Sequence, residues 1–463
     1  MKFLTLAPVL LAGCAAGPNY KRPDLPVPPR FRHDAEPPTT PSLAETKWFD
    51  LFQDPILNDL IRTAIAKNYD LRIAAERVLQ ARAQLGITRS EIFPTVDGRA
   101  QFTSARNSQT GSARFLPRGT NTDVSYTQTG FGLSWELDLW GRIRRLTESA
   151  RADYLASEEA RHGVLTTLVA DVTRGYFSLR ELDLELEIAR KTLAIAQNGL
   201  RLTTLRHERG VVTGLDVHQA EELLYTATAQ IAASERAIAQ QENGLSFLIG
   251  APPGEIARGK ALEELTAPAL VPAGLPSSLL TRRPDIRGAE QTLISANARL
   301  GAARAQYFPQ ISLTGFLGTQ SRQLTDLFIG PAQQFSFAPA ALMPIFNAGR
   351  LRANVRFTEA ARAEALASYE RSIQNAFREV SDALTGYRKT VEQRTQQELL
   401  VRALRERNRL SLLRYQGGLD SYLQVLDAQR NQFQGELSLA RLRREELLSV
   451  IQLYRALGGG WQS

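Results

Sequence analysis

The stretch DLRIAAERVLQARAQLGITRSEIFP, residues 70–94, decides the fold, because it recurs without a gap as DIRGAEQTLISANARLGAARAQYFP, residues 285–309. Self-similarity over such a distance is the mark of a duplicated structural unit. We therefore predict two structural repeats, the first over residues 55–260 and the second over residues 261–463. Each is predicted to run helix, strand, loop, strand, long helix, tight turn, helix.

Two regions without proline predict very long helices. Residues 118–251 and 345–463 contain no proline and are rich in Ala, Leu, Glu, Arg and Gln, which favour helix. Apolar residues recur in them at spacings of three and four. At 1.5 Å per residue, each long helix would span roughly 100 Å, which is typical of a coiled coil or another elongated assembly. The predicted helices are 141–208 and 215–249 in the first repeat, and 285–307, 350–416 and 421–457 in the second.

In the segments between these helices, apolar residues alternate with polar or small ones, as in β-strands. In FGLSWELDL, which begins at Phe131, apolar residues alternate with polar or small ones, so one face of the strand is apolar. Strands of about ten residues with one apolar face suit a transmembrane β-barrel, although a soluble hairpin packed on a core has the same pattern. The predicted strands are 95–105, 124–139, 310–319 and 334–346.

Four strands from one chain cannot close a barrel. In lipid every backbone N–H and C=O needs a partner, so the two edges of the sheet must be paired with other copies. A dimer would supply eight strands around a filled interior, whereas a trimer would supply twelve strands around an open lumen.

The N-terminus predicts export. Residues 1–13 combine Lys2, an apolar segment and small residues, as a signal peptide does, and Leu11-Ala12-Gly13-Cys14 resembles a bacterial lipobox. The alternative is an ordinary export signal that contains a cysteine. Cys14 is the only cysteine, which excludes an intrachain disulfide. Residues 14–54 are rich in proline and are expected to form a lipidated, extended strap.

Composition excludes several other functions. The formal charge of +8 comes from arginines spread along helical segments without a dense basic block, so no nucleic-acid partner is expected. The four histidines form no ligand-spaced cluster with the cysteine, and no phosphate-binding glycine loop occurs. We therefore predict no metal, no cofactor beyond a covalent lipid, and no enzymatic activity.

Several long motifs of this chain match motifs of a known protein family and occur in the same order. They are GPNYKRP, ELDLWGRIRR, LTRRPDIRGAE, LGAARAQYFPQISLTG, PIFNAGRLRANV, AFREVSDAL, YQGGLDSYLQVLDAQR and LYRALGGGW. With these the chain resembles the TolC/OprM-type outer-membrane efflux proteins, in the lipoprotein branch that serves resistance-nodulation-division (RND) pumps. The resemblance covers nearly the whole chain.

The resemblance implies an α+β membrane protein that forms a homotrimer. A twelve-stranded outer-membrane β-barrel, four strands per chain, would continue into a long α-helical periplasmic barrel with a mixed equatorial region. The trimer would sit in the bacterial outer membrane, anchored by diacylglycerol and an N-acyl chain on Cys14, and would extend into the periplasm. Its partners would be outer-membrane lipid, a periplasmic adaptor and an inner-membrane RND transporter.

The implied function is a passive exit duct for small molecules such as drugs. The residues alone leave two alternative functions open. One is the outer-membrane duct of a type I protein secretion system. The other is a coiled-coil envelope lipoprotein without a channel.

The resemblance also places a periplasmic gate at the start of the last helix. Leu423 and Asp427 would line it, one helical turn apart. Arg430, three residues after Asp427, is expected to pair with that carboxylate. Tyr415 completes the predicted gate.

The two helix turns are predicted to contact the adaptor. Ser421 with Gln424, and Thr213 with Asp216, have the spacing of helix capping boxes. Gly210, Gly417 and Gly418 are expected to adopt positive φ. The predicted adaptor-contacting residues are Gly210, Val211, Val212, Thr213, Gly214, Gly417, Gly418 and Leu419.

Overall fold

The computed structural model describes residues 16–32, 42–46, 48–111, 115, 117, 119–267 and 272–461. The predicted signal peptide and Cys14 lie outside these residues. The chain divides into two compact units. Unit 1 comprises Met1–Pro23, Val78–Ala156 and Ala289–Tyr369, and unit 2 comprises Asp24–Arg77, Ser157–Gly288 and Glu370–Ser463.

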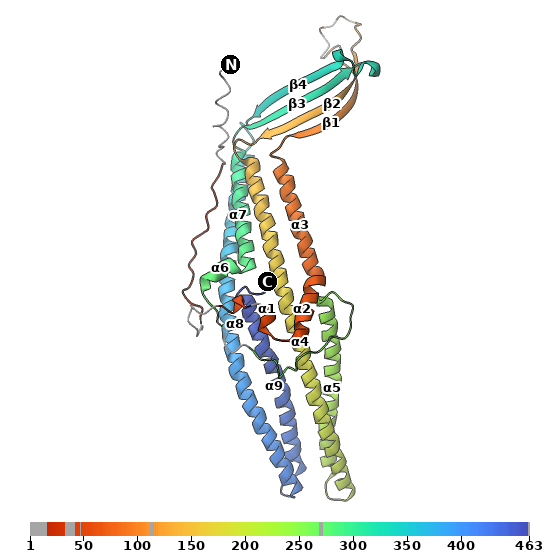
Figure 1. The fold of residues 1–463 in the computed structure, drawn as a ribbon, viewed down its shortest axis with the longest axis vertical. Helices are drawn as coiled ribbons and strands as arrows, with labels where there is room; N and C mark the ends of the chain where they lie inside the picture. The colour runs from red at the N-terminus through yellow and green to blue at the C-terminus, as the bar shows by residue number, and fades with distance from the viewer. Residues whose placement is uncertain are drawn as a thin grey trace. The chain divides into compact units, whose positions relative to one another are not determined.

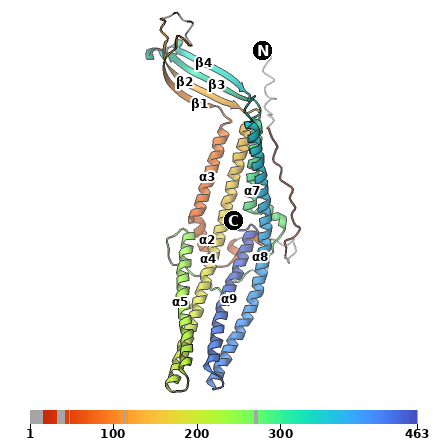
Figure 2. The same ribbon diagram turned by 180° about the vertical axis from the view of Figure 1, so that it is seen from behind.

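Unit 1 contains one four-stranded antiparallel sheet, seen from opposite sides in Figures 1 and 2. Its strands lie in chain order: β1 (Thr95–Arg106), β2 (Asp123–Leu137), β3 (Gln310–Ser321) and β4 (Gln333–Leu342). Each starts within a residue of its predicted start. The predicted end of β4 at residue 346 is wrong: the strand stops at Leu342, because its partner strand β3 starts at Gln310, the residue that pairs with Leu342.

The two faces of this sheet differ in polarity. The register aligns Gly98 with Phe131, Phe131 with Leu317 and Leu317 with Phe335, so these residues share one face. The opposite face carries polar side chains, among them Arg99, Gln128, Thr314 and Gln334. Large apolar side chains on the first face are 63–83% exposed: Val96, Phe102, Phe131, Leu317, Phe335 and Phe337.

Within the described sheet, β1 and β4 are paired on one side only. Their outer backbone groups are therefore open to pairing with another chain. The centre of the sheet, by contrast, is closely packed. Gly130 and Gly318 face each other, and a Cβ on Gly130 would lie 2.4 Å from the Leu317 carbonyl oxygen. The Phe316 ring lies beside both glycines and covers the space that they leave on the polar face.

The segment that begins at Ala16 is held within unit 1. The amide of Ala16 donates to the Trp140 carbonyl at 2.9 Å, and Arg22 pairs with Glu290. Gly17 lies so close to Gly301 that a Cβ would meet its Cα at 2.5 Å. Proline-rich sequence alone predicted an extended strap but not these contacts.

The helices fall close to their predicted bounds. The two long ones are α4 (Arg142–Glu208) and α8 (Arg350–Gln416); α5 (Gly214–Leu248) follows α4, and α9 (Tyr422–Ala456) follows α8. The remaining helices are α1 (Trp48–Leu51), α2 (Pro55–Lys67), α3 (Tyr69–Ser90), α6 (Leu279–Arg282) and α7 (Pro284–Ala305). No described helix has a stretch long and apolar enough to cross a membrane.

The first repeat opens with two helices, α2 and α3, where one was predicted. Asn68 separates them in an extended conformation, with ψ of 134°. Its side chain accepts a hydrogen bond from the Leu71 amide at 3.0 Å and donates to the Leu248 carbonyl at 2.9 Å. Asn68 therefore starts α3 and ties it to the end of α5.

A buried carboxylate organises the start of α2. Asp54 is fully buried and accepts hydrogen bonds from the Ile56 amide at 2.9 Å, the Tyr176 hydroxyl at 2.8 Å and the Lys260 amide at 3.1 Å. A buried charge is tolerated only when it is satisfied in this way. The contacts join α2, α4 and the loop after α5 in unit 2.

Candidate functional site

The candidate site is the end of unit 2 where the two helix hairpins turn. In both ribbon views the α4–α5 turn and the α8–α9 turn lie at the same end of this unit (Figures 1 and 2). Gly210 and Gly418 occupy these turns with φ of 70° and 75°, as predicted. The prediction for Gly417 is wrong. Its amide still donates to the Leu413 carbonyl at 3.0 Å, so it continues the helical pattern without positive φ.

The two turns close in the same way. The Val211 amide donates to the Arg206 carbonyl at 2.9 Å, and the Leu419 amide donates to the Arg414 carbonyl at 2.9 Å. Each bond joins residues five apart across a left-handed glycine, as in a Schellman motif. Val211 and Leu419 occupy equivalent places after the glycines and are 66% and 70% exposed. The repeat thus presents one apolar side chain at each turn.

The two returning helices are capped differently. The Asp216 carboxylate accepts hydrogen bonds from the Thr213 amide at 2.9 Å and the Thr213 hydroxyl at 2.8 Å. This contact is the acidic half of a capping box at the start of α5. The prediction for Ser421 and Gln424 is wrong, because the Ser421 side chain makes no cap hydrogen bond.

The predicted gate residues take other partners than expected. Asp427 forms an ion pair with Arg407 on α8, and Arg430 pairs with Glu222 on α5 at 3.1 Å. The expected Asp427–Arg430 pair within α9 is therefore wrong. Packing of neighbouring helices brings oppositely charged side chains closer than the spacing along α9 does. Leu423 is 48% exposed.

Tyr415 does not line a passage in this chain. Its side chain is buried with Ala220, Tyr422 and Val425, and its ring centroid lies 5.3 Å from that of Tyr422. The Arg206 guanidinium lies 4.7 Å from the Tyr415 ring centroid. The structure thus places Tyr415 in the packing between the two hairpins. Burial also raises the pKa of Tyr422.

The ion pair inside the second turn is exposed. Arg414 donates to the Asp420 carboxylate at 2.6 Å, and this hydrogen bond holds the pKa of Asp420 below its ordinary value. Asp427–Arg407 and Arg430–Glu222 are also about half exposed. Exposed ion pairs of this kind contribute little to stability, because water screens them. Several weak ion pairs therefore hold the helices together near the two turns.

The family model of outer membrane efflux proteins matches residues 60–251 and 275–459. The chain belongs to the outer membrane efflux protein family. Among its relatives, the solvent efflux pump outer membrane protein SrpC of Pseudomonas putida is 41% identical over 476 residues, covering 100% of this chain and 99% of SrpC. The cation efflux system protein CusC of Escherichia coli is 35% identical over 458 residues, covering 98% of this chain and 97% of CusC.

Solved structures resemble this efflux protein over nearly its whole length. The outer-membrane channel OprN aligns with a TM-score of 0.90 and 31% identity, covering 97% of this chain and 100% of OprN. The open state of the Neisseria gonorrhoeae MtrE outer membrane channel aligns with a TM-score of 0.87 and 32% identity, covering 97% and 99%. The predicted family and an outer-membrane efflux function are thereby confirmed.

The efflux protein also has a polar cluster that the sequence analysis missed. Arg441 donates to Glu185 at 2.8 Å, and Arg444 donates to Glu181 at 2.9 Å, so two ion pairs join α9 to α4. We call these four residues the charged collar. The side chains of Glu181 and Glu185 are only 5% and 6% exposed, and burial raises the pKa of Glu181 while Arg444 opposes that rise.

A sequence signal for the charged collar did exist. Glu181 and Glu185 are four residues apart on α4, and Arg441 and Arg444 are three apart on α9, so each pair shares one helix face. The pattern does not show which helices meet. Only the packing of α4 against α9 identifies these faces as partners.

Proposed function

We propose that three copies of this efflux protein form a twelve-stranded barrel in the outer membrane, which serves as a passive exit duct. The supporting observation is the sheet of unit 1, with an exposed apolar face, a polar opposite face and free edges at β1 and β4. An apolar face suits lipid, and a polar face suits an aqueous lumen. Pairing of β4 with β1 of the next copy would satisfy both edges.

The duct would receive its cargo from a periplasmic adaptor and an energised RND transporter. Val211 and Leu419 at the two turns offer the adaptor exposed apolar contacts, flanked by the other turn residues proposed above. Leu423, Asp427 and Arg430 remain the proposed gate. Tyr415 would support the gate from within the hairpin packing.

Planar-bilayer recording of the purified protein tests the duct directly. A detergent-stable trimer with single-channel conductance is expected. A protein that stays monomeric, or a trimer without conductance, would contradict the proposal. Crosslinking from cysteines placed at Val211 and Leu419 tests the adaptor contact, with the exposed residue Arg409 on α8 as the control position.

Small apolar organic molecules are the proposed cargo. Relatives at 40–41% identity are named for solvent, toluene and antibiotic efflux, whereas the cation efflux relative is 35% identical. A deletion strain should lose resistance to toluene and hydrophobic antibiotics and keep its resistance to toxic metal cations. Loss of an exported protein from the medium would instead indicate a type I secretion duct.

Lipidation of Cys14 is part of the proposal, with diacylglycerol and an N-acyl chain as the covalent lipid. The Ala16 amide bonds to the Trp140 carbonyl, directly after the end of β2, which would hold the start of the mature chain near the membrane. A Cys14→Ser variant with an ordinary cleavage site should still assemble, because the barrel supplies an anchor of its own. Mass spectrometry of the mature N-terminus tests the modification, and absence of acyl chains would disprove it.

A further inference from the structure

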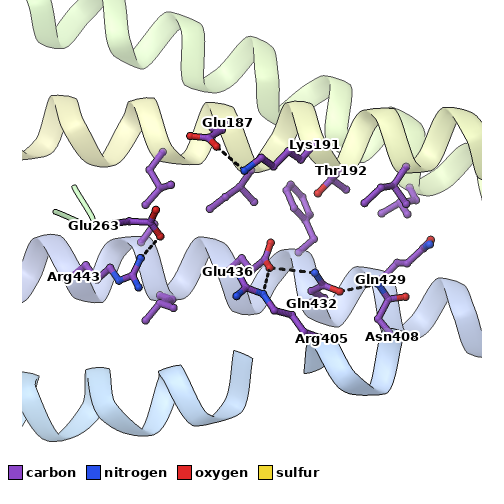
Figure 3. Close-up of a pocket in the computed structure, with 17 residues that line it drawn as sticks. Glu187, Lys191, Thr192, Glu263, Arg405, Asn408, Gln429, Gln432, Glu436 and Arg443 are labelled. Carbon is purple, nitrogen blue, oxygen red and sulfur yellow. Dashed lines mark hydrogen bonds and ion pairs between the residues drawn. The ribbon is translucent and has the colours of Figure 1, made fainter. Parts of the chain in front are cut away.

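The cavity between α4 and α9 in unit 2 contains only paired charges. It measures about 250 Å³, and Figure 3 shows its charged side chains. These side chains form the ion pairs Glu187–Lys191, Arg405–Glu436 and Glu263–Arg443. Charges that neutralise one another attract a charged ligand only weakly. A second cavity, in unit 1, has different surroundings.

The cavity of unit 1 lies on the exposed apolar face of the sheet, beside the loop between β3 and β4. It measures about 1040 Å³, which is comparable with the size of ligand sites. Phe131, Leu317 and Phe335 line it and are neighbours across β2, β3 and β4. Phe328, from the loop, also lines the cavity and is 81% exposed. Aromatic and aliphatic side chains thus surround an open apolar space.

The loop that carries Phe328 is anchored to the sheet. Its neighbour Leu327 is buried, and so is Ala332, whose amide donates to the Ile329 carbonyl at 3.1 Å. The short 3-10 helix Gly330–Ala332 contacts β3. The fold therefore holds the Phe328 ring outside the protein core, where an apolar ligand would cover it.

The side chains beside the cavity change from apolar to polar to cationic toward the end of β3. Beyond Leu317, the same face carries Thr319 and its partner across the strands, Gln333. Arg322 directly follows β3 and is exposed. At about 3.4 Å per residue, it lies roughly 17 Å from Leu317 along the strand direction. The Gln333 amide and the Arg322 guanidinium bond to no other side chain that the structure describes.

This order of chemistry is that of a phosphorylated lipid, in which an apolar chain is followed by an ester or amide linkage and then by a phosphate. Guanidinium groups bind phosphate well, because their N–H donors match its oxygens. A second copy of this chain would pair at the free edges of β1 and β4, and so would leave the apolar face open to lipid. Lipid is therefore the occupant that fits both the apolar space and the free cation.

We propose that this cavity binds a phosphorylated lipid of the outer leaflet of the outer membrane. The acyl chain lies over Leu317 and Phe328, the linkage oxygens meet Gln333, and the phosphate meets Arg322. The leaflet follows from the topology, since α3, α4, α7 and α8 all join the strands at the end opposite this loop (Figures 1 and 2). This inference rests on the proposed barrel, in which those helices point into the periplasm.

Native mass spectrometry of the full-length trimer tests the site, with lipid A as the phosphorylated lipid of that leaflet. Wild type should bind lipid A about tenfold more tightly than its dephosphorylated form, the value of one charge-assisted contact. Arg322→Gln should weaken lipid A binding about tenfold and leave the dephosphorylated form unchanged. Arg322→Lys, which keeps the charge, should retain most of the binding. Phe328→Ser should weaken the binding of both forms.

Two matched variants serve as controls. Arg352→Gln removes an exposed arginine from the first turn of α8, at the opposite end of the sheet in unit 1. Leu324→Ser removes an exposed apolar side chain from the same loop as Phe328, outside the cavity. Both should bind lipid A as wild type does.

Three results would overturn the inference. Arg322→Gln and Phe328→Ser could bind lipid A as tightly as wild type, wild type could bind both lipid forms equally, or inorganic phosphate alone could displace lipid A. A wild-type trimer that conducts but binds no lipid A would overturn this inference and leave the duct standing. A protein that stays monomeric would instead disprove the barrel, and this inference with it.

Discussion

The charged collar and the end of unit 2 at the two helix turns contain the same residue types, but these residues contribute differently to stability. Both consist of arginine–carboxylate pairs between neighbouring helices. At the collar the carboxylates of Glu181 and Glu185 are nearly inaccessible to water, whereas Asp427 and Glu222 near the turns are about half exposed. Burial, not the number of ion pairs, separates the region where losing one partner is costly from the region where it costs little.

The largest expected effect comes from removing an arginine of the charged collar. Arg444→Ala leaves the Glu181 carboxylate buried without its partner, which should destabilise the fold by about 3 kcal/mol. The temperature at which the trimer dissociates should fall clearly. Arg409→Ala is the control, because its pair with Glu406 is on the surface, and it should leave that temperature unchanged.

Breaking the exposed pairs should change conductance more than stability. Arg407→Ala should open the gate as far as Asp427→Ala does, because the two residues form one pair, and the double variant should add little. Glu222→Ala should likewise match Arg430→Ala. Bilayer conductance measures each effect. An Arg407 variant that behaves like wild type would show that Asp427 acts through another partner.

Acidity should change the stability that the charged collar contributes to the fold. Burial raises the pKa of Glu181 above its ordinary value of 4.5, so the folded chain binds this proton more readily than the unfolded chain. Its contribution to stability is therefore fullest below pH 4.5 and is lost as the pH rises through the raised pKa. Thermal dissociation of wild type and Glu181→Gln across this range should show the difference. Equal pH dependence of the two would contradict it.

The smallest expected effect separates the two turns. Asp216→Ala removes the acidic half of the capping box on α5 and should cost about 0.5–1 kcal/mol. Gln424→Ala removes no cap contact of Ser421 and should cost less. Paired thermal scans of the two variants test this ranking. A larger loss at Gln424 would show that the second turn depends on a contact outside the single chain.

The long helices and the strands could be predicted because their signals are local. Proline-free sequence and apolar spacing place α4 and α8, and alternation places the four strands. The partners of Asp427 and Arg430 could not be predicted, since they depend on which faces of α5, α8 and α9 meet. Burial of Tyr415 was missed for the same reason. The break at Asn68 was missed because its amide must reach the end of α5.

The open edges of β1 and β4 have a genetic consequence. In the proposed ring of three copies, every sheet edge is completed by a neighbour, so one subunit with a blocked edge would leave the whole barrel unclosed. A damaged subunit made beside the intact one would therefore prevent closure of every ring that it enters. Mutations at these strands should be dominant in a merodiploid, whereas mutations that unfold the subunit before it meets its neighbours should be recessive.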